Sequence, residues 1–323
     1  MNDLEKFFSI SIRGASHIKS GKPMQDYSLA YKGDDFCVGV VCDGHGADKH
    51  FRSEIGSESA AHVAIDKLIE FCKLNYDWNT FHFDTQKKLY RLKLSIISDW
   101  QSKIESYTQD NPFTEDELKK ASSSFKARQS YDIAQPYGTT LLAAMICHDY
   151  YLVMMIGDGA IVKILPDFSS EIIEFPGKPK FEDQPHSATD SLCEPGCYSK
   201  IFFQYDKLNP NGGEAFALCS DGLSEAFSTD AGLLAKINNY LNYYAEEGIE
   251  KAKSAIEAQL NELSRISPMK DDISLVFVTN SLNKYIKVST PKTDVPQDIG
   301  EDSANSGDVV ASTYRDIING KKD

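Results

Sequence analysis

Residues 40–50 read VVCDGHGADKH, and the stretch closes an apolar run that begins at Val38. A short run rich in valine predicts a buried strand. The run ends abruptly at Asp43, which is followed by Gly-His-Gly. Aspartate and glycine are common in turns, so a simple turn would explain this ending. The explanation weakens only if the same pattern recurs elsewhere in the chain.

The pattern does recur. An apolar strand followed by Asp-Gly is found again at Asp158 and at Asp221, while Asp26 and the pair Asp271-Asp272 immediately precede two other predicted strands. Each aspartate alone is an ordinary turn signal. As a set, they predict several carboxylates at the rim of one core.

Carboxylates gathered in this way repel one another, which raises their pKa values and costs stability. A hard dication such as Mg²⁺ or Mn²⁺ removes this cost, because it takes oxygen ligands and completes its shell with water. Glycine beside the aspartate lets a backbone carbonyl or a substrate approach closely. We therefore predict a carboxylate-rich metal site, suited to phosphate chemistry and unlike a zinc site.

The composition is that of an ordinary globular protein, with 323 residues, 41% hydrophobic and 25% charged. The net charge of −14 and the pI near 5.0 argue against a surface for nucleic acid or anionic membranes. No run approaches the roughly 18 apolar residues of a membrane span. The N-terminus lacks a secretory layout, and the seven cysteines are scattered through the chain. We expect a reduced, cytoplasmic, monomeric protein.

Strands and helices are predicted in blocks. Strands are expected at 27–31, 36–42, 139–147, 150–156, 160–165, 171–175, 198–204, 215–219 and 273–279. Helices with apolar residues at i, i+3 and i+4 are expected at 54–72, 89–104, 233–244 and 249–263. Two residues separate 139–147 from 150–156, which is too few for a helical crossover, so this pairing is antiparallel. The pattern predicts an α+β fold with sheets between helical layers.

Three regions stand out from this core. Residues 281–323 are polar and aperiodic, which predicts a largely disordered tail. The Ser-rich part at 108–136 indicates an exposed insertion, within a helical region of about 75–135. The Pro- and Gly-containing segment 166–200 predicts a mobile loop, with a passive surface loop as the alternative. Residues 1–280 are expected to form one domain.

In chain order, the motifs QD, CDGHG, YGTT, IGDG, CSDG and KDDISLVFV resemble those of the metal-dependent protein serine/threonine phosphatases, the PPM or type 2C family. The stretch GASHIKSGKPMQDYSLA resembles a bacterial-type subgroup, and the match covers about residues 9–280. The resemblance implies a central antiparallel β-sandwich flanked by helix pairs, in α-β-β-α layers. It also implies dephosphorylation of phospho-Ser/Thr on proteins by direct attack of a metal-bridging hydroxide, without a phosphoenzyme.

The resemblance further implies two Mg²⁺ or Mn²⁺ ions in a core site. Asp43 is expected to bridge the ions, and Gly44 to bind the second ion through its carbonyl. Asp221 and Asp271 are expected as further ligands of the first ion.

Three more residues are assigned by the same resemblance. Asp26 is expected to act through metal-bound water, and Asp158 to form a third, weaker metal site together with Asp221. His45 is expected to protonate the departing Ser or Thr oxygen, because a near-neutral pKa suits a general acid. The alternative for His45 is a turn histidine hydrogen-bonded to solvent.

Several positions depart from the family pattern. Gly21 stands where many members place a phosphate-binding Arg, so Lys22 or Arg13 is the candidate for the substrate phosphate. Lys22 would act as a point charge without the bidentate fork of Arg. Asp272 replaces the usual Asn and either strengthens metal binding or caps the strand.

Two alternatives are left open, and Gly21 and Gln25, which replaces the usual Glu, motivate the first of them. One is a catalytically weak or silent phosphoprotein-binding scaffold on the same fold, although the retained carboxylates argue against it. The other is a hydrolase of a small phosphorylated metabolite. Segment 166–200 occupies the place of the family's flap, a loop that shapes access to the metals.

Overall fold

The computed structural model describes residues 7–128, 132–178, 189–209 and 212–286. Two five-stranded antiparallel sheets pack face to face in this part of the chain. The first sheet has the order β1 (Ser9–Ile12), β10 (Ile273–Thr279), β9 (Ala215–Cys219), β6 (Ala160–Ile164) and β7 (Ser170–Ile172). The second has the order β2 (Asp26–Lys32), β3 (Cys37–Asp43), β4 (Leu141–Ile146), β5 (Tyr150–Ile156) and β8 (Phe202–Lys207).

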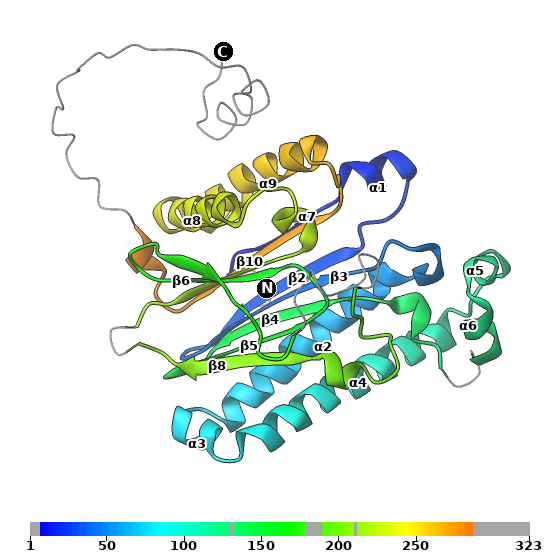
Figure 1. Cartoon of the computed structure of the whole chain (residues 1–323), viewed down its shortest axis with the longest axis horizontal. Helices are drawn as coiled ribbons and strands as arrows, with labels where there is room; N and C mark the ends of the chain where they lie inside the picture. Colours follow the sequence, from blue (N-terminus) through cyan, green and yellow to red (C-terminus); the bar gives the residue numbers. More distant parts are fainter. Residues whose placement is uncertain (1–6, 129–131, 179–188, 210–211, 287–323) are drawn as a thin grey trace, which may run out of the picture. The chain divides into compact units, whose positions relative to one another are not determined.

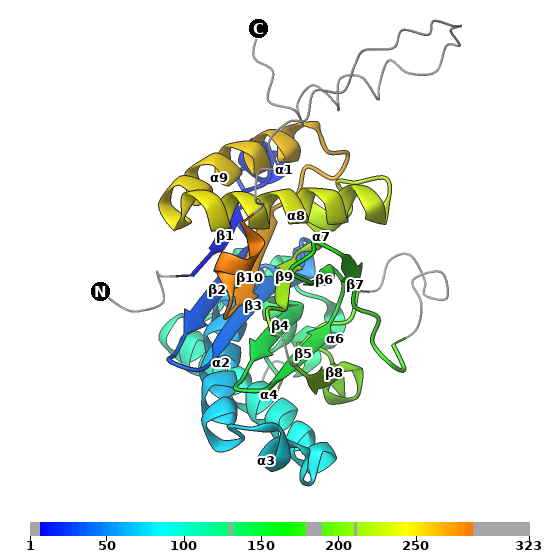
Figure 2. The ribbon, with the colours of Figure 1, turned by 90° about the vertical axis from the view of Figure 1, so that its left-hand side faces the viewer.

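Helices cover the outer face of each sheet (Figure 1). The four predicted helices are α2 (Ser53–Leu74), α4 (Thr85–Asp110), α8 (Asp230–Glu247) and α9 (Ile249–Ile266). The pair α8 and α9 lies on the side of β1 and β10, and the pair α2 and α4 lies on the side of β2 to β5 (Figure 2). The predicted α-β-β-α layering is therefore confirmed.

Shorter helices occupy the connections. They are α1 (Ala15–Ser20), α3 (Trp78–His82), α5 (Glu115–Lys120), α6 (Ser123–Arg128) and α7 (Asp221–Ser224), with 3₁₀ turns at Asp48–His50, Gln135–Tyr137, Cys197–Lys200 and Leu282–Tyr285. No helix among the described residues is both long and apolar enough to span a bilayer.

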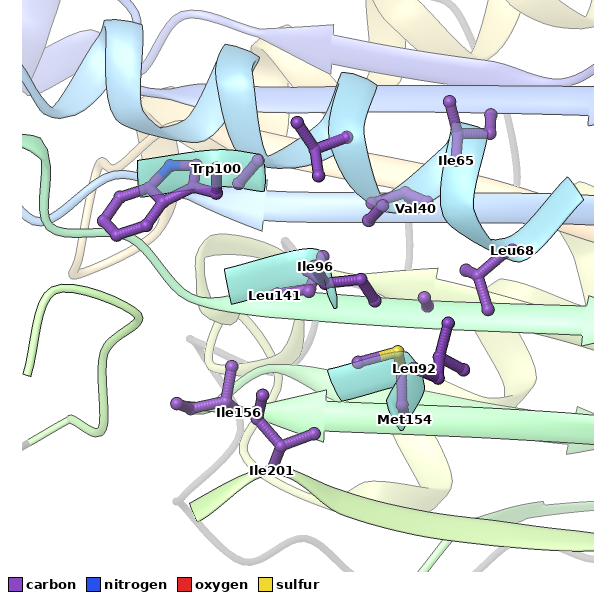
Figure 3. Packing of buried hydrophobic residues seen from close by; sticks show 14 of the residues in the cluster. Val40, Ile65, Leu68, Leu92, Ile96, Trp100, Leu141, Met154, Ile156 and Ile201 are labelled. Atoms are coloured by element: carbon purple, nitrogen blue, oxygen red, sulfur yellow. The ribbon is translucent and has the colours of Figure 1, made fainter. Parts of the chain in front are cut away.

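The helix-facing core of the second sheet shows why these segments fold as they do. Leu92, Ile96 and Trp100 recur at helical spacing on α4 and pack with residues of α2 and the sheet, such as Leu68 and Val40 (Figure 3). The indole N–H of Trp100 donates to the Gly56 carbonyl at 3.0 Å, so its one polar atom is satisfied inside the core. The apolar face of α4 therefore fixes the position of α2 against the sheet.

One predicted strand boundary needs correction, and three short elements were missed. The strand predicted at 198–204 begins only at Phe202, because Cys197–Lys200 forms a 3₁₀ turn after Gly196, whose φ is 76°. Strand β1 and helices α1 and α7 were not predicted, since each has at most six residues and too little periodicity to detect.

The cysteines are not all reduced, which also corrects the prediction. Cys72 at the end of α2 and Cys147 after β4 form a disulfide, with their Cα atoms 6.1 Å apart. Their 75-residue separation gave no sign of this pairing. The other five cysteines are free.

The beginning of the predicted tail is ordered. Residues 282–285 form a 3₁₀ turn, and Tyr285 is completely buried, with its hydroxyl donating to the Ile164 carbonyl at 2.8 Å. The packed domain thus extends to Ile286, six residues beyond the expected boundary at 280. Residues 287–323 lie outside the described part of the chain.

Arg52 ties the helical insertion to the rest of the domain. Its guanidinium forms a bidentate pair with Glu117 of α5, at 2.7 and 3.0 Å, and donates to the Tyr137 hydroxyl at 3.0 Å. The Arg52 side chain is only 8% exposed, so the carboxylate of Glu117 offsets the cost of burying its charge.

We expect Glu117→Gln to lower the free energy of unfolding by about 1–3 kcal/mol, because Arg52 is left buried without a counter-charge. Urea denaturation measures this loss. Glu115→Gln, at an exposed position on the same helix, is the matched control. Equal stability of the two variants would contradict a structural role for the ion pair.

Candidate active site

Strand register brings the aspartates of the motifs to one end of the two sheets. In the second sheet, Asp26 at the start of β2 pairs directly with Asp43 at the end of β3. In the first sheet, Cys219 at the end of β9 pairs with Ala160 at the start of β6, so the neighbouring Asp221 and Asp158 lie at the same edge. The fold therefore creates the carboxylate rim that the sequence predicts.

Asp43, Asp158 and Asp221 form one group, with one carboxylate oxygen of each within 4.8 Å of the others. Burial, followed by the charges of Asp26 and Asp221, raises the pKa of Asp43 well above its usual range. Burial is also the main cause that raises the pKa of Asp221 to about 6, with Asp158 and Asp271 adding repulsion. The metal-free group therefore resists full ionisation.

The donor set fits a divalent cation. Asp26 Oδ2 and Asp221 Oδ1 are buried and have no hydrogen-bond partner among the described residues. A buried polar atom without a partner is costly and calls for an explanation such as a missing ion. Oxygen donors without a cysteine match the preference of Mg²⁺ and Mn²⁺.

Asp26 is deeply buried, with 3% of the residue exposed. Burial, followed by the charge of Asp272, raises its pKa well above the usual range. Hydrogen bonds to the Ser220 and Ser274 hydroxyls oppose this shift. Neither serine was predicted as a site residue, and no pattern in the sequence links them to Asp26.

Asp271 belongs to a second group, formed with His17 and Asp272. Its side chain is 40% exposed and lies 3.6 Å from His17 Nε2. The charge of Asp271 nevertheless raises the pKa of Asp221, so the two groups interact electrostatically. The structure thus brings the predicted carboxylates to one end of the sandwich, with Asp43, Asp158 and Asp221 in one group and Asp271 in another.

Gly44 occupies a place where no other residue fits. A Cβ there would lie 2.7 Å from both the Gln25 and the Ser53 carbonyl oxygens. The Gly44 N–H donates to the Gln25 carbonyl at 3.0 Å. On the opposite side, the Thr140 N–H and the Thr139 hydroxyl donate to the Asp43 carbonyl at 2.8 and 3.0 Å. The backbone of Asp43 and Gly44 is therefore held from both neighbouring strands.

His45 is less exposed than a solvent-bonded turn histidine would be. Its Nε2 is buried without a hydrogen-bond partner among the described residues, and its ring lies 5.0 Å from that of His50. Burial, then the charges of His50 and Lys49, lower the pKa of His45 to about 3. The imidazole of the metal-free site is thus neutral at pH 7. This low pKa differs from the near-neutral pKa on which the general-acid expectation rests.

The two candidate phosphate ligands are placed differently. The Arg13 guanidinium donates to the His17 carbonyl at 3.1 Å and to the Lys22 carbonyl, so it is engaged by the loop backbone. Lys22 Nζ donates to the Gly46 carbonyl at 2.8 Å, which places the ammonium beside the Asp-Gly-His-Gly turn. This placement favours Lys22 over Arg13.

Part of segment 166–200 contributes to the site, although residues 179–188 lie outside the described chain. The Thr189 hydroxyl donates to Asp158 Oδ2 at 2.6 Å, and Lys178 Nζ donates to the Gly157 carbonyl at 2.8 Å. A cavity of about 390 Å³ beside His45 is lined by this segment and by the loops that follow β3 and α6, including Lys49, His50, Gln135, Thr189, Ser191 and Glu194. The cavity adjoins the carboxylate rim through His45 and Thr189.

Solved structures share this fold at low sequence identity. A bacterial serine phosphatase is 16% identical, with a TM-score of 0.51 over 85% of this chain and 97% of its own. A C. elegans sex-determining protein is 14% identical, with a TM-score of 0.51 over 89% of this chain and 68% of its own. The catalytic domain of the phosphatase PstP, solved with two manganese ions, is 16% identical, with a TM-score of 0.49 over 84% and 96%.

No curated protein matches the sequence. The family model described as protein phosphatase 2C matches residues 13–263, which is most of the chain and includes Asp26, Asp43, Asp158 and Asp221. This chain therefore belongs to the protein phosphatase 2C family of metal-dependent serine/threonine protein phosphatases.

Proposed function

We propose that the carboxylate rim is the catalytic centre and that it removes phosphate from phosphoserine and phosphothreonine on proteins. In this proposal Asp43, Asp158 and Asp221 hold divalent cations, together with the Gly44 carbonyl and Asp271. When bound, Mg²⁺ or Mn²⁺ would lower the pKa of a water molecule and neutralise charge on the phosphoryl oxygens.

The observation that supports this proposal best is the crowding of partly buried carboxylates. Three carboxylates lie within 4.8 Å of one another, and buried oxygens of Asp26 and Asp221 have no donor among the described residues. A protein gains no stability from such a group, because repulsion and desolvation both oppose it. A scaffold that only recognised phosphoproteins would not need this arrangement.

The chain's own residues have distinct proposed tasks. Asp26 orients water from its buried position beside Asp43, with which it pairs across β2 and β3. Lys22 attracts the phosphate from the edge of the turn. His45 faces the leaving-group side, where its buried imidazole has one nitrogen without a partner among the described residues. A neutral imidazole carries a proton on only one of its two nitrogens. His45 can therefore act as a general acid only if the bound substrate raises its pKa enough to protonate the second nitrogen.

Membership of a protein phosphatase family supports a protein substrate over a small metabolite. The adjoining cavity of about 390 Å³, lined by both polar and apolar residues, is open to either class of substrate. A phosphothreonine peptide and a panel of phosphorylated metabolites, compared at equal Mn²⁺, test this choice. We expect kcat/KM at least about 10-fold higher for the peptide, and the reverse order would favour the metabolite hydrolase. Absence of hydrolysis in both arms, with Mn²⁺ present, would favour the silent scaffold.

Lys22→Ala is expected to raise KM for a phosphopeptide about 5- to 10-fold with little change in kcat, because a point charge beside the turn binds ground and transition states alike. Lys22→Arg should restore most of the affinity. Steady-state kinetics measure the effect, with Lys19→Ala, an exposed position on α1, as the control. An unchanged KM for Lys22→Ala would remove Lys22 from phosphate binding.

A further inference from the structure

Asp272 is a buried carboxylate next to the proposed ligand Asp271, and its side chain is only 1% exposed. Oδ1 accepts hydrogen bonds from the Gly14 N–H at 2.6 Å and from His17 Nδ1 at 2.9 Å. Oδ2 accepts from the Gln25 N–H at 2.6 Å. Both oxygens are therefore occupied by donors of the chain itself, which leaves Asp272 unsuited to a metal ion.

The donors to Asp272 belong to one connection, residues 14–25, which contains α1 and leads directly into Asp26. Other contacts press this connection against the residues before β10. The Ser16 N–H donates to the Lys270 carbonyl at 2.9 Å. A Cβ on Gly14 would lie 2.3 Å from the Asp271 carbonyl carbon, so the two backbones touch. Asp272 lies at the centre of this contact.

His17 contacts the same oxygen of Asp272, Oδ1, that accepts from the Gly14 N–H. Its ring is buried, Nδ1 contacts Asp272 at 2.9 Å, and Nε2 lies 3.6 Å from Asp271. The two nitrogens thus contact residues with different proposed tasks. One nitrogen faces the structural carboxylate, and the other faces the proposed ligand.

We infer that His17 and Asp272 are positioning residues for the metal centre, acting together across 255 positions of the chain. Asp272 aligns the 14–25 connection with the start of β10, and His17 keeps the carboxylate in the orientation that receives the Gly14 and Gln25 amides. Asp26 follows Gln25, and Asp271 precedes Asp272. The positions of Asp26 and Asp271 relative to each other are thereby fixed. The role in metal binding rests on the proposed function, whereas the structural coupling does not.

Two substitutions at His17 separate the contributions of its nitrogens. The amide nitrogen of Asn can occupy the place of Nδ1, and the longer Gln places its amide nearer to Nε2. If His17 acts through Asp272, His17→Asn should retain function and His17→Gln should not. If His17 acts on Asp271 or on phosphate, the order should be reversed. Lys19→Gln removes a charge from the exposed face of α1 and serves as the control.

Calorimetric titration with Mn²⁺ and steady-state kinetics on p-nitrophenyl phosphate provide the readouts. We expect His17→Leu and His17→Gln to weaken Mn²⁺ affinity about 10- to 100-fold, the effect typical of residues that orient metal ligands. His17→Asn and Lys19→Gln should remain within about 3-fold of the wild type. Full affinity in His17→Leu, or rescue by Gln and not by Asn, would overturn the inference.

Asp272→Asn supplies a readout that is independent of metal and of activity. The carboxylate accepts hydrogen bonds from the backbone N–H groups of Gly14 and Gln25. Whichever way the Asn amide is turned, its NH₂ group faces one of these N–H donors, and that hydrogen bond is lost. Hydrogen exchange followed by NMR should show faster exchange at Gly14 and Gln25 in this variant and in His17→Leu. Unchanged protection would overturn the coupling even if the enzyme is active. If the variants lose protection at these amides but the wild type binds no Mn²⁺, the coupling stands and only the proposed function is contradicted.

Discussion

Asp43→Asn is expected to lower kcat for a phosphothreonine peptide by at least about 10³-fold in the presence of Mn²⁺. Asp43 lies at the end of β3, opposite Asp26, and forms a carboxylate group with Asp158 and Asp221. The amide keeps the size of the side chain but removes the charge that two cations would share. The loss should therefore be chemical rather than structural.

The fold should survive this substitution, which separates it from simple unfolding. Asn removes one of the repelling charges, so the melting temperature of the metal-free variant should equal or exceed that of the wild type. Asp34→Asn, exposed at the opposite end of the same hairpin, is the matched control and should retain full activity. Substantial activity of Asp43→Asn would exclude Asp43 as a central ligand.

Metal-free protein is expected to lose stability as the pH rises from about 4 to 7. The pKa of Asp221 is raised from 3.8 to about 6 in the folded chain. Above pH 3.8 the unfolded state releases this proton while the folded state retains it, so the free energy of unfolding falls until the folded pKa is passed. The loss linked to Asp221 is about 1–3 kcal/mol. Asp26 and Asp43, whose pKa values are also raised, change stability in the same direction.

Bound Mn²⁺ should reverse this trend, because the ion binds the ionised carboxylates and displaces their protons. At a free concentration 100-fold above Kd, the gain is about 2.7 kcal/mol. Thermal melts from pH 4.5 to 7.5, with EDTA and with Mn²⁺, measure both effects, and Asp43→Asn should show the shallower slope in EDTA. A pH-independent melting temperature in EDTA would contradict repulsion within the carboxylate group.

Long, strongly patterned segments made most of the fold predictable. The apolar faces of α4 and α9 and the uninterrupted apolar strands β4 and β5 correspond to segments with clear periods. The errors lie where tertiary contacts determine the local structure. The turn at Cys197–Lys200 and the disulfide of Cys72 with Cys147 depend on neighbours distant in sequence.

The candidate site was predictable to a similar extent. The Asp-Gly endings of strands indicated Asp43, Asp158 and Asp221 before their proximity was known. The task of Asp272 was left open between metal binding and capping, and its three donors at Gly14, His17 and Gln25 favour a structural role. No local pattern reveals such a contact, because its partners lie about 250 residues apart.

Anomalous diffraction from crystals grown with Mn²⁺ tests the central claim most directly, since it locates the ions without reference to activity. The proposal predicts two strong anomalous peaks at the carboxylate end of the sandwich, one of them within ligand distance, about 2.0–2.3 Å, of both Asp43 and Asp221. A map without anomalous density between these side chains, at saturating Mn²⁺ and near-neutral pH, would contradict it.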